Sequence, residues 1–166
     1  MFLPFAIFFQ TIPIIAIAPL LVIYFGFGAP TAIASSTIVG IFPMIANCVV
    51  SLSSTPRELL QLFELYKSSR WQTFWKLQLP NAYLGIFSGI KVCAGLCVIG
   101  AVAGEFVGGG GIGALIDSAR TQQRLDIVYA SLLLLSLIGL LLMAILNFCH
   151  NFILKIRPLA PTSKSR

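Results

Sequence analysis

Charged side chains are scarce in this sequence of 166 residues. Asp, Glu, Lys and Arg together make up 10% of it, whereas an ordinary soluble domain carries about 25%. No charged residue precedes Arg57, hydrophobic residues account for 58% of the chain, and mean hydropathy is +0.96. Because a soluble fold of this length could not cover so much apolar surface, the composition excludes an ordinary soluble domain and predicts a membrane protein.

Histidine and acidic residues are also few, so most arrangements of catalytic or metal-binding side chains are excluded. The chain has one histidine, His150, and five acidic residues, with no Asp pair at membrane depth and no His-Glu metal motif. The glycine-rich stretch 108–113 is not followed by the Lys-Ser/Thr of a phosphate-binding loop, so we expect an ordinary external turn there. An intramembrane enzyme is therefore the least favoured function. We expect no catalytic residue and no metal, and we place His150 at the membrane interface.

The cysteines do not have the spacing of metal ligands. All of them fall within predicted membrane spans, where free thiols pack as small, buried hydrophobic residues. They are Cys48, Cys93, Cys97 and Cys149.

Long stretches without charge predict an all-α, multi-pass membrane helix bundle. A helix that crosses a hydrocarbon core of about 30 Å needs roughly 20 apolar residues. The sequence supplies enough such residues for about four membrane helices, provided that Lys91 lies within the third. The first two are separated by FGFGAP, residues 25–30, whose glycines and proline predict a turn. The predicted spans are 2–25, 31–53, 82–103 and 127–150.

The distribution of basic residues predicts the orientation. Lys and Arg concentrate in segment 55–80 and near the C-terminus, whereas segment 104–126 balances its two Arg against three acidic residues. The positive-inside rule then makes segment 55–80 and the tail, 159–166, cytoplasmic and makes 104–126 external. This asymmetry accounts for the net charge of +6, and no nucleic-acid partner is needed to explain it.

The cytoplasmic segment 55–80 is predicted to be a rigid pair of short helices. Thr55-Pro56-Arg57-Glu58 and Ser69-Arg70-Trp71-Gln72 both have the pattern of a capping box, and Pro80 is expected to end the second helix. Aromatic residues are expected to anchor the pair to its own membrane domain, leaving a polar corner around residues 67–70. The alternative is an amphipathic segment that lies on the membrane surface.

The same segment resembles the EAA loop of ATP-binding-cassette importer permeases. That pattern reads Glu-Ala-Ala, three residues, Gly, nine residues, Ile, one residue, Leu-Pro. Leu79-Pro80 matches its end, Leu77 takes the Ile position and Lys67 the Gly position. Residues 61–63, Gln-Leu-Phe, fall where Glu-Ala-Ala would lie. The sequence therefore departs from the pattern at its Glu-Ala-Ala and Gly positions.

Three further stretches resemble the nitrate, sulfonate, taurine and thiamine-precursor branch of these permeases. They are QTIPIIAIAPLLVIYFGFG (10–28), FPMIANCVVSL (42–52) and GEFVGGGGIGALI (104–116). The resemblance implies the fold of a type I importer permease. Family members are longer at the N-terminus by about two membrane helices, so it also implies a truncated permease, a split permease, or one whose start was assigned late.

The resemblance implies a division of labour between subunits. The chain would be the permease of a bacterial inner-membrane importer, paired with a second permease subunit, as a homodimer. An external solute-binding protein would deliver the solute. A cytoplasmic ATPase, using ATP and Mg, would grip the corner, so this chain would bind no cofactor itself. The implied coupling residues are Gln61, Lys67, Ser68, Ser69, Arg70, Trp71, Leu79 and Pro80.

Polar residues within or beside the predicted spans are candidates for the solute pathway or its gate. Lys91 could line the pathway or extend its side chain to the cytoplasmic interface. Glu105 fits a gate or the external water boundary, and the boundary is favoured. Asn47 is expected to make a hydrogen bond between helices.

The alternative to a transporter is a permease fragment that acts as a small membrane scaffold without transport. The solute itself is not determined by the sequence. A sulfonate, nitrate, taurine or a thiamine precursor would each fit the resemblance, and the QTIP stretch favours the last.

Overall fold

The computed structural model of the chain describes residues 13–156, and these residues form helices without any strand. The expectation of an all-α fold is therefore confirmed for this part of the chain. In order, the helices are α2 (Ile14–Phe25), α3 (Ala29–Ser53), α4 (Arg57–Leu65), α5 (Arg70–Thr73), the π-helix η1 (Phe74–Gln78), α6 (Leu79–Gly108), α7 (Gly111–Thr121) and α8 (Leu125–Ile156).

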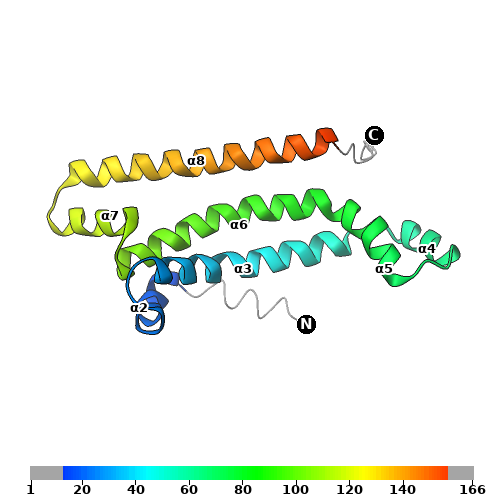
Figure 1. Cartoon of the computed structure of the whole chain (residues 1–166), viewed down its shortest axis with the longest axis horizontal. Helices are drawn as coiled ribbons and strands as arrows, with labels where there is room; N and C mark the ends of the chain where they lie inside the picture. Colours follow the sequence, from blue (N-terminus) through cyan, green and yellow to red (C-terminus); the bar gives the residue numbers. More distant parts are fainter. Residues whose placement is uncertain (1–12, 157–166) are drawn as a thin grey trace.

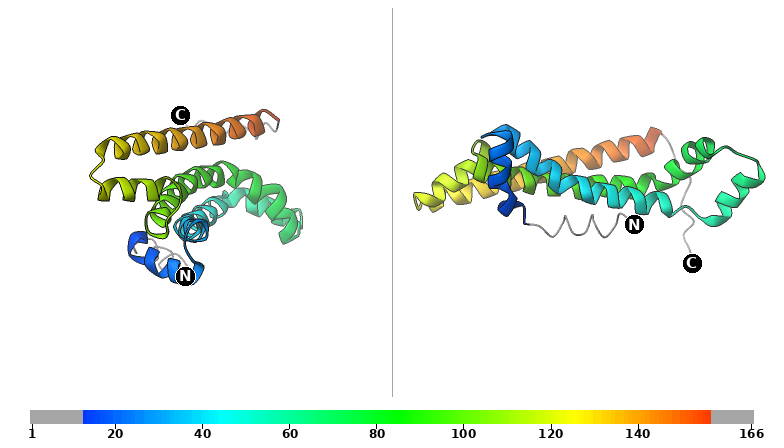
Figure 2. Two further views of the ribbon diagram at one scale, coloured as in Figure 1. Left: turned by 60° about the vertical axis from the view of Figure 1, so that its left-hand side comes forward. Right: turned by 90° about the horizontal axis from the view of Figure 1, so that it is seen from below.

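The three long helices run along the long axis of the molecule (Figure 1). Helices α3 and α6 lie side by side and antiparallel, and α8 runs along the other side of α6 (Figures 1 and 2). The short helices α4 and α5 project beyond one end, whereas α2, α7 and the glycine turns gather at the opposite end. The molecule therefore has a hairpin end and a turn end, joined by long apolar helices.

Within residues 13–156, three helical stretches are long and apolar enough to cross a membrane: Ala29–Ser53, Arg70–Gly108 and Leu125–Lys155. They overlap the predicted spans 31–53, 82–103 and 127–150. The first begins earlier than predicted and ends at the predicted residue, and the other two extend past both predicted limits. Helix α2 has 12 residues, which is shorter than a crossing helix. The first predicted span, 2–25, includes residues that lie outside the described part, so that span stays a prediction.

A seam of small residues joins α3 to the turn-end half of α6. The Ser35 hydroxyl is fully buried and donates to the Gly100 carbonyl at 2.7 Å. A Cβ added at Gly100 would lie 2.8 Å from the Ser36 Cα, and one added at Gly104 would lie 2.8 Å from the Ala32 Cα. Such close backbone approach is how membrane helices associate when lipid removes the hydrophobic drive.

The seam continues along the other half of α6, where thiols replace some of the glycines. The Cys93 thiol donates to the Gly40 carbonyl at 3.2 Å, and a Cβ added at Gly40 would lie 2.4 Å from the Cys97 sulfur. Both thiols are half-buried and act as small packing groups. Cys149 on α8 is exposed, so the expectation of burial was wrong there, because α8 has almost no neighbour on that face.

The predicted turn at residues 25–30 is confirmed and is held to the other glycine turn. Gly26 and Gly28 have φ of 84° and 85°, a conformation that favours glycine. The Gly28 amide donates to the Gly108 carbonyl at 2.7 Å, and the buried Thr31 hydroxyl donates to the Gly26 carbonyl. The glycine-rich stretch 108–113 therefore includes the end of α6, a short turn and the start of α7, and it is tied to the first turn through Gly108.

Candidate functional site

Two short helices, α4 and α5, meet at a corner formed by residues 66–69, as the sequence predicts. Lys67 lies in the left-handed region with φ of 51°. Its amide donates to the Glu64 carbonyl at 2.9 Å, and the Ser68 amide donates to the Phe63 carbonyl at 3.1 Å. This pair of bonds is a Schellman motif, in which glycine is preferred at the left-handed position. The resembled pattern has Gly at this position, where a residue without a Cβ adopts the left-handed conformation without strain. In this chain Lys67 occupies that position.

The predicted capping box at Ser69 is confirmed. The Gln72 amide donates to the Ser69 hydroxyl at 3.3 Å, and the Ser69 amide donates to the Gln72 side-chain oxygen at 3.1 Å. Two amides at the start of α5 thereby gain partners. Hydrogen bonds therefore order the start of α5 as well as the end of α4.

The predicted capping box at Thr55 is wrong. Thr55 is buried, and its hydroxyl donates back to the Leu52 carbonyl at 3.3 Å, at the end of α3. Pro56, with ψ of 136°, is the residue before α4, which makes no side-chain cap bond. The Thr55 hydroxyl closes the preceding helix because the extended Pro56 separates it from the start of the next one.

Pro80 does not end the second short helix, contrary to the sequence prediction. Helix α5 continues through η1 into α6 as one helical stretch of 39 residues, Arg70–Gly108. A proline in a helix removes one backbone donor and crowds the carbonyl four residues earlier. The π-helical turn directly before Pro80 changes the local hydrogen-bond register, which lets the helix continue. The corner is therefore joined directly to a membrane-crossing helix.

Large apolar side chains around the corner are exposed, so the expectation that they anchor the pair to its own membrane domain is wrong. The exposed fractions are 77% for Tyr66, 74% for Trp71 and 58% for Trp75. Leu65, beside the corner, is 80% exposed. The hairpin projects past one end of the long helices (Figure 1).

The coupling residues that the sequence predicts fall into three groups. Residues 67–71 form and flank the corner, and all are exposed except the half-buried Ser68. Gln61 is exposed on α4. Leu79 and Pro80 lie at the start of α6, half-buried and exposed respectively.

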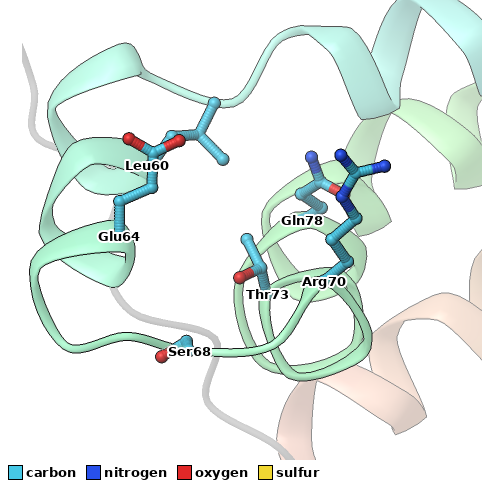
Figure 3. A pocket seen from close by; sticks show the side chains of 6 residues that line it. All are labelled: Leu60, Glu64, Ser68, Arg70, Thr73 and Gln78. Atoms are coloured by element: carbon cyan, nitrogen blue, oxygen red, sulfur yellow. The ribbon is translucent and has the colours of Figure 1, made fainter.

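A polar cleft of about 320 Å³ lies inside the hairpin. Figure 3 shows Leu60 and Glu64 of α4 on one side and Arg70, Thr73 and Gln78 on the other, with Ser68 at the corner. Sequence reasoning found Ser68 and Arg70 but missed Glu64, Thr73 and Gln78. No sequence signal identifies them, because their proximity follows from the angle at which the two helices meet.

Asn47 makes its hydrogen bond within α3, not between helices as expected. Its amide donates to the Pro43 carbonyl at 2.8 Å. Pro43 stands inside α3, so Asn47 supplies a donor beside a helix turn that contains proline. A Cβ added at Gly89 of α6 would lie 2.6 Å from the Asn47 Cβ. Asn47 therefore packs into the seam.

Lys91 is half-buried and belongs to a cluster of rings between α6 and α8. Its amine lies 5.2 Å from the centre of the Phe87 ring, which is one turn nearer the hairpin end. The Phe87 ring also stacks on His150 of α8, with 4.2 Å between centroids, and lies 6.1 Å from the Tyr83 ring. The Tyr83 hydroxyl lies 3.4 Å from the His150 Nδ1.

Glu105 caps α7 at the turn end. Its Oε2 accepts from the Gly113 amide at 2.9 Å, where the first turn of a helix offers free donors. A Cβ added at Gly111, whose φ is 65°, would lie 2.2 Å from the Glu105 carboxylate. Glycine in this turn is thus required by the approach of the carboxylate.

The sequence matches a known family of transport proteins. Residues 1–156 match the family model for the binding-protein-dependent transport system inner membrane component. A probable ABC transporter permease protein of Haemophilus influenzae is 37% identical over 153 residues, which cover 91% of this chain and 62% of that protein.

Two further relatives are each 33% identical. The riboflavin transport system permease protein RibX of Chloroflexus aurantiacus is matched over 88% of this chain and 55% of its own length. The formylaminopyrimidine transport permease protein ThiX of Halalkalibacterium halodurans is matched over 87% of this chain and 58% of its own length. The chain thus spans little more than half the length of these curated relatives.

Proposed function

This chain belongs to the family of binding-protein-dependent transport inner-membrane components, and we propose that it is a permease subunit of an ATP-driven importer. As a family member it is a multi-pass inner-membrane protein and a transport component, not an enzyme. The alternative of a scaffold without transport is not favoured, because the named relatives are transport permeases.

The observation that carries the proposal is the mechanical continuity between the exposed corner and a crossing helix. The corner is fixed by a Schellman motif on one side and a capping box on the other. From Arg70 the chain continues as a single helical stretch to Gly108. A displacement of the corner would therefore move α6, and α3 with it through the seam of glycines.

We propose the following partners. A cytoplasmic ATPase binds the corner and uses ATP and Mg, so this chain holds no cofactor of its own. A second permease subunit, a copy of this chain, completes the pathway, and an external binding protein delivers the solute. The exposed aromatic residues at the corner support an ATPase contact, since Trp and Tyr are common anchors at interfaces.

The proposed orientation puts the hairpin end and the C-terminus in the cytoplasm and the glycine turns outside. On this orientation, the amine of Lys91 lies toward the cytoplasmic end of α6, which supports an interfacial role over one in the pathway. Capping of α7 likewise supports a role for Glu105 at the external boundary.

The proposed solute is a small nitrogen heterocycle or a small anion. The relatives with 33% identity are named for riboflavin, formylaminopyrimidine and nitrate transport. The two with heterocyclic solutes support a thiamine precursor or a related ring compound.

The proposal is tested by removing the corner. Deleting Ser68–Ser69, or replacing Lys67→Glu, should abolish co-purification with the ATPase subunit, while the chain still inserts into membranes and elutes as a single species in detergent. The control replacement is Lys155→Glu, in the last turn of α8 and outside the corner. It should leave co-purification unchanged. Retention of the ATPase by the deletion variant would contradict the proposal.

A further inference from the structure

We propose that the polar cleft inside the α4–α5 hairpin receives a segment of the ATPase that carries charges of both signs. A carboxylate of that segment would pair with Arg70, and a cationic side chain would pair with Glu64. This inference rests on the proposed function and adds to it: the hairpin is a receptor for the ATPase, besides being inserted into it.

The two charges that face each other across the cleft are available for a partner. Glu64 and Arg70 are both exposed and line opposite walls (Figure 3). Within residues 13–156 the ion pairs are Arg120–Asp117 and Arg124–Asp126, both at the turn end. Neither Glu64 nor Arg70 is therefore neutralised by a neighbour in that part of the chain.

The wall around Arg70 is suited to a carboxylate. A guanidinium can donate two parallel hydrogen bonds to a carboxylate. The Ser68 hydroxyl and the Gln78 amide line the same cleft and can add donors. Thr73 also lines it, but its hydroxyl already donates to the Ser69 carbonyl at 3.2 Å. A carboxylate beside Arg70 would thus find several donors already in place.

The opposite wall requires the occupant to carry a positive charge as well. A free anion attracted to Arg70 would face the carboxylate of Glu64, and like charges in one site repel. An occupant with a carboxylate and an ammonium or guanidinium satisfies both walls. Within residues 13–156 neither Glu64 nor Arg70 has an ion-pair partner, so both are available to an occupant that carries the matching charges.

The size of the cleft fits side chains and not a secondary-structure element. The cleft has a volume of about 320 Å³ and is lined by the side chains of two short helical segments and the corner between them. A helix with side chains is about 10–12 Å across and would not enter. Hydrogen bonds order the corner at the end of α4 and at the start of α5, so less ordering of these two segments is needed when a partner binds.

Matched charge reversals test the inference on the full chain in detergent with its ATPase subunit. Glu64→Arg and Arg70→Glu should each weaken the ATPase dissociation constant by about tenfold or more, with a stronger effect at low salt. Glu58→Arg and Arg57→Glu carry the same charge changes on α4 but lie outside the cleft lining. They should change the constant by about twofold at most.

Neutral variants and the corner deletion keep the outcomes distinct. If a reversal variant aggregates, Glu64→Gln and Arg70→Gln preserve size and should still weaken binding by more than Glu58→Gln and Arg57→Gln. If cleft variants bind normally while deletion of Ser68–Ser69 releases the ATPase, the cleft inference is overturned and the proposed function stands. If the deletion variant also binds normally, both are overturned.

Discussion

The seam between α3 and α6 and the hairpin of α4 and α5 use opposite means to present a surface. The seam consists of glycine, serine and cysteine, and its backbones approach so closely that added Cβ atoms would collide with them. The hairpin presents large side chains instead, including Trp71 and Tyr66, and leaves them exposed. Small residues thus mark the contact made within this chain, and large exposed ones mark the proposed contact with another protein.

The difference follows from the solvent around each region. Inside a membrane, lipid tails solvate apolar side chains as well as a protein core does, so helices gain by close backbone contact. In water, exposed aromatic rings are costly and are usually covered by a partner. The surface of the hairpin therefore favours docking, whereas the seam favours a permanent fit.

The largest expected effect separates the seam from an open helix surface. Gly104→Leu should destabilise the folded protein by about 3 kcal/mol, because its Cβ would press on the Ser35 hydroxyl and the backbone of Ala32. Thermal unfolding in detergent measures this as a lower midpoint. Gly139→Leu adds the same side chain to α8 at a site with nothing within 4 Å, so it should leave the midpoint nearly unchanged or raise it. Equal effects of the two variants would show that the seam is not a tight contact.

The face of α6 toward α8 should respond more weakly than the seam. His150→Ala removes the stack on Phe87 and the contact with Tyr83, which should cost about 1 kcal/mol. His150→Phe keeps a ring against Phe87 and should recover most of the loss. The measurement is the thermal unfolding midpoint of each variant. If both variants lower the midpoint equally, the stabilisation comes from the Tyr83 contact and not from the stack on Phe87.

The capping box should matter more for coupling than for global stability. Ser69→Ala removes the side-chain acceptor of the Gln72 amide and should cost about 1 kcal/mol locally. We expect weaker stimulation of the ATPase by the chain, together with faster amide exchange across α5, while the unfolding midpoint changes little. Thr55→Ala is the comparison, because Thr55 caps the preceding helix and should not alter exchange in α5. Unchanged exchange in Ser69→Ala would argue against the box as a source of rigidity.

The smallest expected effect is a gain. Lys67→Gly relieves the left-handed strain, worth about 1–2 kcal/mol, but adds about 0.5–1 kcal/mol of chain entropy, so the net stabilisation should be near 0.5 kcal/mol. The analogous replacement Gln123→Gly, at the turn end with φ of 56°, should give a similar gain. Amide exchange rates at the two positions allow the comparison. If exchange becomes slower at neither position, the left-handed conformation is not a source of strain there.

Much of the fold could be predicted from patterns that are local in the sequence. Apolar stretches of sufficient length predicted the long helices, and FGFGAP predicted the turn before α3. The Ser69 box could be predicted because both of its partners lie within three residues. The box at Thr55 has the same residue pattern but does not form, since the Thr55 hydroxyl donates to the Leu52 carbonyl instead.

The sequence by itself determined that the chain is helical and apolar and that an ordered corner separates two of its long helices. Only the tertiary structure decided that α5 runs through Pro80 into α6, that Trp71 is exposed, and that Glu64 and Arg70 line opposite walls of one cleft. The physical reason is range. Helix formation and capping depend on residues within a turn or two, whereas the angle between helices and the facing of distant side chains depend on packing along the whole length of α3 and α6.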